Sequence, residues 1–264
     1  MTRFNFPLAP EMLDKHTLFA PAVDSKDADF DTMLRAVKSA MAQEFAGLEL
    51  LKSARQRLVL RMPYDGQTVI LKLFPLSNPA SRLRYKKYAL REFQNYDRAR
   101  AAGIPSPRCF GYIERRSFGF VNLCGVILED LAEYRDALQL SAHGGYVQAA
   151  MRCIAPLGQL YETGVNHIDA RDENILFRAD VHKIIDWQYA SFVEPRAAWF
   201  LEHLSAYFIR KAPEVERVAL ENIWLWELHT TAAHGSEFDT FQTRVKTLLA
   251  NRQGTRARLA LRPA

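Results

Sequence analysis

The sequence predicts an α+β protein in which a small antiparallel β-sheet with one helix is followed by a mainly helical part. Three strand-like runs follow one another at 48–52, 57–62 and 67–74. Apolar residues then recur at helical spacing over 85–101 and again over 146–163. The length of 264 residues suits one domain of two lobes, and 48% hydrophobic and 25% charged residues allow a sizeable globular core.

The strand-like runs place a lysine on an apolar face. The turn Pro63-Tyr64-Asp65-Gly66 between the second and third runs favours a hairpin. In the third run Ile70, Lys72 and Phe74 share one face, because successive side chains of a strand point to opposite sides. Lys72 is therefore either a lysine on a half-exposed strand or a cation held for a specific partner.

The helix predicted over 85–101 offers that partner. Glu92 lies on its apolar stripe, three residues after Ala89 and four before Tyr96. An unpaired carboxylate on an inward-facing stripe would be costly. We therefore predict that Glu92 forms an ion pair with Lys72.

Other segments extend this outline. Residues 30–45 predict an amphipathic helix near the N-terminus. The apolar strand 126–128 gives way to the polar connector 129–131, which predicts the hinge between the two lobes. The helix predicted over 146–163 contains Pro156, so we expect a kink or a break there.

The stretch 167–187 is the most informative part of the chain. Two short apolar runs, 175–177 and 181–185, are joined by three residues and predict a β-hairpin. A hairpin brings its outer ends together, so Asn174 and Asp186 should lie beside each other at its open end. The alternative is an ordinary turn whose Asp and Asn residues only cap the backbone.

The spacing of polar residues in this stretch suits phosphoryl transfer. Asp169 is followed five residues later by Asn174, and twelve residues beyond that by Asp186. Transfer from a metal-bound nucleotide needs one carboxylate to orient the attacking hydroxyl. It also needs an amide oxygen and a second carboxylate to hold Mg²⁺.

This pattern resembles the catalytic loop of the protein-kinase superfamily, H-R-D-L-x-x-x-N, whose metal-binding Asp follows on the next hairpin. Here Ile168 replaces the Arg, and Arg171 stands where Ser/Thr kinases usually carry Lys. The resemblance covers about residues 46–210 and implies a bilobal protein-kinase-like fold. The implied domains are an N-terminal helical extension, 1–45, an N-lobe, 46–128, and a C-lobe with a basic C-terminal tail, 129–264.

The resemblance assigns roles to the loop and hairpin residues. Asp169 would act as the catalytic base, and Arg171 would stabilise the charge on the migrating phosphoryl group. His167 would pack the loop and transfer no proton. ATP and Mg²⁺ are the implied cofactors, with Asn174 and Asp186 as the metal ligands.

The resemblance also implies a nucleotide site in the N-lobe. Lys72 would bind the phosphates of ATP, and Glu92 would hold Lys72 in place. No G-x-G-x-x-G joins the first two strands. Backbone N–H groups, or the side chains of Ser53 and Arg55, would therefore have to meet the phosphates. At the hinge, the residues expected to meet the adenine edge are Glu129 and Leu131.

One branch of the superfamily is favoured. The missing glycine loop, the stretch 51–59, the helix end 102–107 and the compact C-terminal part resemble bacterial lipopolysaccharide kinases. Those enzymes phosphorylate Kdo or heptose in the inner core, so the implied reaction is transfer of the γ-phosphoryl group of ATP to a sugar hydroxyl. Asp186-Trp187-Gln188 replaces D-F-G and no A-P-E follows, so a phosphorylated activation loop is not expected.

The net charge of +5 is unevenly placed. Seven basic and two acidic residues lie between Arg82 and Arg100, and six basic and no acidic residues lie from Arg244 to the end. Such clusters favour an anionic glycolipid, an anionic sugar or a membrane surface as partner, with solvated helical faces as the alternative. No nucleic-acid-binding module is recognisable, so no nucleic-acid partner is expected. The oligomeric state is left open.

The cellular setting follows from what the sequence lacks. No run approaches about 18 consecutive apolar residues, and no apolar core of a signal peptide is present near the N-terminus. We expect a cytoplasmic protein, with peripheral contact at the inner face of the bacterial inner membrane if the acceptor is a glycolipid. The three cysteines show no close pairing, so neither a disulfide framework nor a zinc site is expected.

Two other functions share these motifs. A small-molecule phosphotransferase of the aminoglycoside or choline kinase type would carry the same loop, but such enzymes usually build an acidic pocket for cationic substrates. A non-catalytic pseudokinase scaffold would be expected to lose the lysine, the base or the metal Asp, and this chain retains all three.

Overall fold

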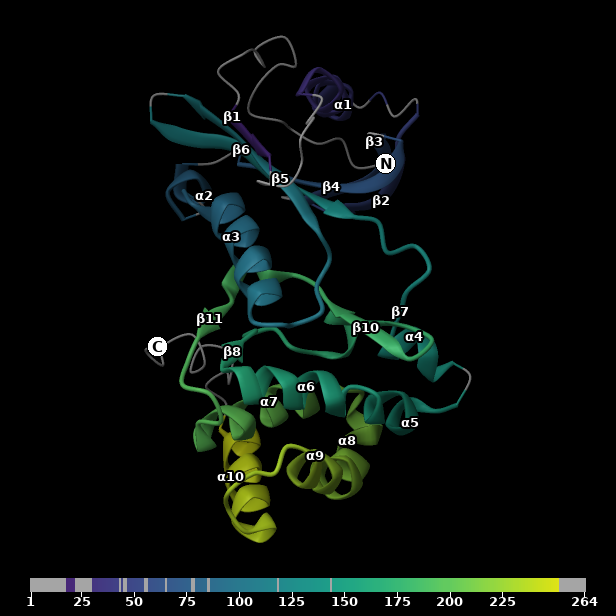
Figure 1. The fold of residues 1–264 in the computed structure, drawn as a ribbon, viewed down its shortest axis with the longest axis vertical. Coiled ribbons are helices and arrows are strands. Elements are labelled where there is room, and N and C mark those ends of the chain that lie inside the picture. The colour runs from purple at the N-terminus through teal and green to yellow at the C-terminus, as the bar shows by residue number, and fades with distance from the viewer. Residues whose placement is uncertain are drawn as a thin grey trace. The chain divides into compact units, whose positions relative to one another are not determined.

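The computed structural model describes residues 18–21, 30–42, 44, 47–54, 57–64, 66–76, 79–84, 86–117, 119–142 and 144–251. These residues form two compact units, whose elements are labelled in Figure 1. The first unit comprises the described residues up to Asp97 and Pro107–Leu131, and the second comprises Arg98–Ser106 and the described residues from Ala132 onward. An antiparallel sheet and several helices are present, which confirms the predicted mixed α/β composition.

The first unit is built on a six-stranded antiparallel sheet with the order β1-β5-β6-β4-β3-β2. The three predicted strands are β2 (Glu49–Ala54), β3 (Arg57–Tyr64) and β4 (Gln67–Pro75), and the predicted apolar strand is the end of β6 (Phe120–Glu129). Two strands were not predicted, β1 (Leu18–Pro21) and β5 (Cys109–Ser117). The first has only four residues, and the second ends in charged residues that interrupt its apolar pattern.

Helices cover both faces of this sheet. On one face α1 (Phe30–Ala42) packs its apolar side against buried residues of β3 and β4, including Leu60 and Leu71. On the other face lies α3 (Tyr88–Ala101), where the rings of Phe74 and Tyr88 are 4.8 Å apart. Figure 1 shows the two helices on opposite sides of the sheet. Because strand side chains alternate, Lys72 points away from the α1 face.

Several predicted element boundaries differ by one to three residues from the structure, as the strand bounds above and three further cases show. The N-terminal helix ends at Ala42 rather than at residue 45. The helix predicted from residue 85 begins at Tyr88, since Lys86 and Lys87 form a turn after the short helix α2 (Pro79–Arg84). The second strand of the predicted hairpin ends at Ile184 rather than Ile185.

The second unit is mainly helical and carries two small sheets, with strand orders β10-β9-β7 and β11-β8. The α-helices and strands of the second unit are β7 (Arg135–Asp136), α4 (Ala137–Ser141), α5 (Tyr146–Met151), α6 (Ile154–Thr163), β8 (Val165–Asn166), β9 (Ile175–Arg178), β10 (Val181–Ile184), β11 (Ser191–Phe192), α7 (Ala198–Lys211), α8 (Arg217–Ala219), α9 (Leu225–Thr231) and α10 (Phe238–Ala250). In the whole described part of the chain, no helix has both the length and the apolar character needed to cross a membrane.

The helix predicted over 146–163 is broken into α5 and α6 at Arg152-Cys153. Pro156 is the third residue of α6, where a backbone N–H would have no partner within the helix. The proline therefore fits the first turn of a new helix. Gly164 ends α6 in the left-handed conformation, and a Cβ there would approach Val193 O to 2.2 Å.

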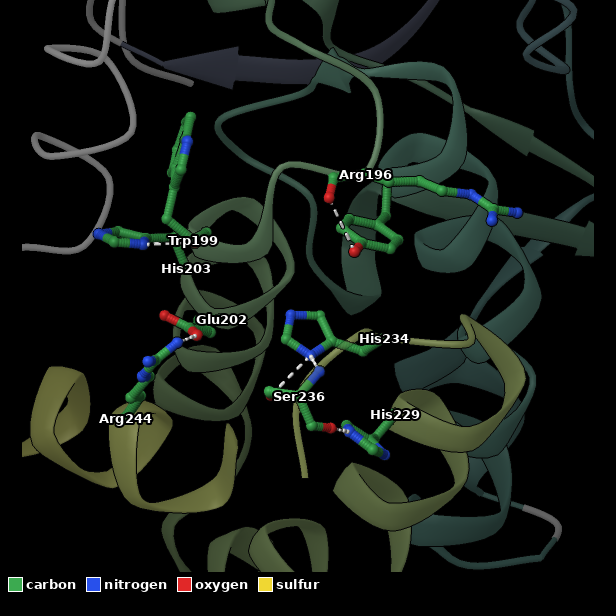
Figure 2. Close-up of polar contacts among 9 residues, drawn as sticks. Arg196, Trp199, Glu202, His203, His229, His234, Ser236 and Arg244 are labelled. Atoms are coloured by element: carbon green, nitrogen blue, oxygen red, sulfur yellow. Dashed lines mark hydrogen bonds and ion pairs between the residues drawn. The ribbon is translucent and has the colours of Figure 1, made fainter. Parts of the chain in front are cut away.

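Polar contacts fix the C-terminal helices of this unit (Figure 2). Arg244 on α10 forms a 3.0 Å ion pair with Glu202 on α7. The ring of His229, on α9, bonds to Ser236 O at 2.7 Å, and after α9 His234 Nδ1 lies 2.9 Å from the Ser236 hydroxyl. These contacts hold α7 against α10 and define the connection from α9 to α10.

Candidate functional site

The predicted hairpin is present and brings two site residues together. The strands β9 and β10 pair antiparallel, with Ile175 opposite Ile184. The Ile185 N–H continues the ladder by donating to Asn174 O at 3.0 Å. Asn174 and Asp186 therefore flank the open end of the hairpin, one on each strand extension.

The loop before the hairpin joins Asn174 to Asp169. The side-chain amide nitrogen of Asn174 donates to Asp169 O at 2.9 Å, and residues Asp172–Asn174 form a 3₁₀ turn. Asn174 is 5% exposed. Because the amide nitrogen is used within the loop, the side-chain oxygen is the atom that could bind a cation.

Asp186 has an unusual backbone conformation. Its φ of 69° and ψ of 52° lie in the left-handed region, which residues other than Gly, Asn and Asp rarely adopt. The following residue, Trp187, is fully buried, and its indole N–H donates to Ile184 O at 2.8 Å. The buried tryptophan thus anchors the chain beside a strained residue. Such conformations cluster at functional sites.

His167 supports the hairpin from within. Its Nε2 lies 2.7 Å from Ile185 O, and since a carbonyl only accepts, this nitrogen must carry a proton and donate. Its ring meets the Trp187 ring edge-to-face at 4.5 Å. Burial lowers the pKa of His167 below its usual value, with the bond to Ile185 O opposing that shift. The neutral, buried ring suits the structural role expected for it.

Two tyrosines of the site were not predicted from the sequence. The hydroxyl of Tyr207, on α7, donates to the Asp169 carboxylate, and the Tyr146 hydroxyl, on α5, donates to Asp172 Oδ2 at 2.8 Å. Burial, together with the Asp172 carboxylate, raises the pKa of Tyr146. Both hydroxyls therefore act as hydrogen-bond donors that hold loop carboxylates. Their positions in the chain gave no signal, because they lie 38 and 26 residues from their partners.

Arg171 lies on the surface of the same loop. Its guanidinium pairs with the Glu173 carboxylate, and the two side chains are 28% and 45% exposed. An ion pair this exposed contributes little to stability. The structure therefore leaves the role of Arg171 as a prediction.

In the first unit the predicted ion pair is present. Lys72 Nζ lies 2.8 Å from Glu92 Oε1, and the side chains are 5% and 0% exposed. Lys72 also lies 5.5 Å from the centre of the Phe74 ring, on the same face of β4. A cation and a carboxylate almost out of contact with water are costly unless paired, so each accounts for the burial of the other.

Two of the remaining predicted nucleotide contacts, Ser53 and Glu129, lie near the ends of strands in the first unit. Ser53 is an exposed residue of β2, and Arg55 lies outside the described residues. Glu129 ends β6, and its carboxylate accepts the Arg108 N–H at 3.0 Å. Leu131 follows it and is partly exposed. Their contacts with a nucleotide stay predictions.

The donor set in the second unit suits magnesium. Among the described residues, no group of three or more His, Cys, Asp or Glu could hold a metal ion. Asn174 and Asp186 offer hard oxygen donors, and Mg²⁺ is usually bound through one or two carboxylates together with substrate phosphates. These residues fit a Mg²⁺ ion that is held jointly with a nucleotide.

The cysteines offer no competing chemistry. Cys109, Cys124 and Cys153 are free and buried. Burial raises the pKa of each thiol well above its usual value. Because the thiolate is the reactive form, these buried thiols are unsuited to act as nucleophiles.

Comparisons with known proteins complete the description. No protein-family model matches the chain, and no curated protein matches it. Among solved structures the chain is similar to WaaP in complex with acyl carrier protein, with 18% sequence identity and a TM-score of 0.47. The match covers 82% of this chain and 88% of the matched chain.

Proposed function

We propose that this chain is a Mg²⁺- and ATP-dependent kinase that transfers the γ-phosphoryl group to a sugar hydroxyl of the lipopolysaccharide inner core, on Kdo or heptose. The observation that carries the proposal is the loop in which Asn174 bonds to Asp169 and lies beside Asp186 at the hairpin end. The buried Lys72–Glu92 pair supports it, because a kinase site needs such a lysine for the nucleotide phosphates.

The residues would divide the chemistry as follows. Asp169 would orient the acceptor hydroxyl and accept its proton as the new O–P bond forms, while the Tyr207 hydroxyl holds the carboxylate. Asn174 and Asp186 would hold Mg²⁺, which supplies charge neutralisation at the phosphates when it is bound. Lys72 would bind phosphate oxygens.

The choice of acceptor is supported by charge. The chain carries a net charge of +5, with basic clusters at 82–100 and from Arg244 onward. An anionic glycolipid or its core sugar complements such clusters better than a cationic aminoglycoside or choline. If the acceptor is embedded in a bilayer, the protein must contact the surface of that membrane to reach it.

The nucleotide half of the proposal is tested by ligand-induced stabilisation. A ligand that binds only the native state at about 100 times its Kd stabilises by about 2.7 kcal/mol. Millimolar Mg²⁺-ATP should therefore raise the Tm of the wild-type protein, and Asp186→Ala should lose the Mg²⁺-dependent part of the shift. A wild-type protein without any shift, beside a control kinase that responds, would refute nucleotide binding.

The acceptor half is tested by turnover. Purified protein is assayed with [γ-³²P]ATP on deacylated core oligosaccharide, whole lipopolysaccharide, choline and a panel of aminoglycosides, with Asp169→Asn as the inactive control. Labelling of the core sugars supports the proposal. Labelling of aminoglycosides or choline alone would identify a small-molecule phosphotransferase, and nucleotide binding without turnover on any acceptor would identify a pseudokinase.

The tail arginines provide a separate test of the glycolipid. Arg252, Arg256 and Arg258 lie outside the described residues. Reversing their charge should raise KM for lipopolysaccharide and leave KM for ATP unchanged, since attraction to an anionic surface is screened and local. An unchanged KM for lipopolysaccharide would exclude the tail from acceptor binding.

A further inference from the structure

A basic surface on the first unit is formed by three neighbouring segments: α2, the turn Lys86-Lys87 before α3, and the turn end of the β5–β6 hairpin (α2, α3, β5 and β6 in Figure 1). The guanidinium of Arg116, on β5, donates to Lys86 O at 3.4 Å. The Leu76 N–H, just before α2, donates to Asn122 O on β6 at 2.8 Å. These bonds bring the three segments together. We call the surface that the three segments form the α2–hairpin surface.

The described part of this surface presents cations without exposed carboxylates. From Pro79 to Lys87 the sequence has four basic residues and no acidic residue, and the next acidic residue, Glu92 on α3, is fully buried and paired. On the hairpin, Glu114 is 3% exposed and accepts the Nε–H of Arg116. The charges that reach water here are therefore positive, from residues such as Lys86, Lys87 and Arg116.

Two large apolar side chains stand out among these cations. Leu83, on α2, is 63% exposed, and Phe120, at the start of β6, is 43% exposed. Phe120 pairs with Ser117 across the hairpin turn, next to Arg116. Exposed apolar side chains such as Leu83 and Phe120 would make no favourable contact with a small phosphate ligand. A site for single-stranded nucleic acid would need a series of aromatic rings, and leucine cannot stack on a base.

We propose that the α2–hairpin surface docks on an anionic lipid membrane. Leu83 and Phe120 enter the boundary between headgroups and acyl chains, and Lys86, Lys87 and Arg116 meet the lipid phosphates. This deepens the proposed function, since it brings a kinase with a glycolipid acceptor to the surface that holds its acceptor. Vesicle binding is nevertheless measured without nucleotide or acceptor, so it is read independently of activity.

The test is sedimentation of the full-length protein with vesicles of phosphatidylcholine alone or with about 30% phosphatidylglycerol. We expect binding to the anionic vesicles only, weakened by high salt. The double variant Lys86→Glu/Lys87→Glu should bind at least about tenfold more weakly, since each lysine near an anionic surface contributes about a fivefold factor. Leu83→Ser/Phe120→Ser should weaken the binding that remains at high salt.

A matched control has the same change in net charge at other exposed lysines, Lys52→Glu/Lys211→Glu. It should bind within about twofold of wild type. Circular dichroism establishes that every variant is folded. Absence of wild-type binding to anionic vesicles, or equal losses in the test and control variants, would overturn the proposal. Binding of an oligonucleotide in place of the vesicles would replace it with a nucleic-acid surface.

Activity on a soluble acceptor separates the two proposals. At saturating deacylated oligosaccharide, Lys86→Glu/Lys87→Glu should keep its kcat, because the substitutions lie outside the proposed catalytic residues and a weaker attraction to the anionic sugar would change only KM. Membrane binding without any kinase activity would refute the proposed function and leave the docking surface standing. Kinase activity without membrane binding would do the reverse.

Discussion

Replacing Glu92 by leucine tests the most buried polar contact of the candidate site. The Lys72 and Glu92 charges are 2.8 Å apart, which corresponds to about 6 kcal/mol of attraction at an effective dielectric constant of about 20. Removing both charges from water costs several kcal/mol per ion, so the pair contributes little net stability. Glu92→Leu, however, leaves the Lys72 ammonium buried without this carboxylate. We expect the first unit to lose about 3–5 kcal/mol of unfolding free energy.

The double variant Lys72→Met/Glu92→Leu provides the comparison. It replaces the pair with apolar groups of similar size, so its unfolding free energy should lie within about 1 kcal/mol of wild type or above it. The loss of stability in the double variant should therefore be much smaller than the sum of the losses in Lys72→Met and Glu92→Leu, which gives a large coupling free energy between the two residues. Both variants should lack kinase activity, because the double variant has no Lys72 and Glu92→Leu has no carboxylate to hold Lys72 in place.

The assay must report on the first unit. All four tryptophans, at 187, 199, 224 and 226, lie in the second unit. Urea unfolding is therefore followed by far-UV circular dichroism and by hydrogen exchange of peptides from β4 and α3, with tryptophan fluorescence as an internal control for the second unit. Glu133→Gln is the matched exposed case: its pair with Arg178 has the same 2.8 Å distance but side-chain exposures of 75% and 53%. It should cost less than about 1 kcal/mol.

The result that would refute this reasoning is a small loss for Glu92→Leu, below about 1 kcal/mol. A double variant whose loss equals the sum of the losses measured for Lys72→Met and Glu92→Leu separately would do so as well. Either result would mean that the pair is open to water in solution, and the ion pair would then give no support to a nucleotide site.

Three further predictions concern the second unit. Asp169→Asn should lower kcat more than about tenfold with nucleotide binding nearly intact, and a variant that keeps over a tenth of wild-type kcat would exclude Asp169 as the base. Tyr207→Phe removes one hydrogen bond to that carboxylate, so kcat should fall by roughly tenfold while KM for ATP stays within about twofold; a change confined to KM for ATP would contradict the assigned position. Burial lowers the pKa of His167 in the folded chain, so below about pH 6.5 the unfolded chain binds a proton that the folded chain resists. Stability should therefore decline as the pH falls from about 7 to 5. His167→Gln should reduce the dependence of Tm on pH over this range. Part of the dependence should remain, because burial also lowers the pKa of His182. An identical dependence of Tm on pH in the variant and the wild type would show that His167 is not responsible.

Local pattern alone was enough to predict the hairpin and its two polar ends. Two short apolar runs separated by three residues are close enough in the sequence to pair with each other, and this pairing sets Asn174 beside Asp186. The ion pair was predictable for a similar reason. Lys72 and Glu92 each break the apolar periodicity of their own element, and two buried opposite charges in adjacent elements need each other.

Tertiary structure decided the rest. Tyr207 and Tyr146 reach the loop only because α7 and α5 pack where they do, and neither residue departs from the pattern of its helix. The left-handed backbone of Asp186 was likewise not predictable, since no glycine marks it and the burial of Trp187 holds it in place. Periodicity within a segment reports which side chains turn inward. The identity of the groups they meet depends on helix packing across long sequence separations, which no local pattern encodes.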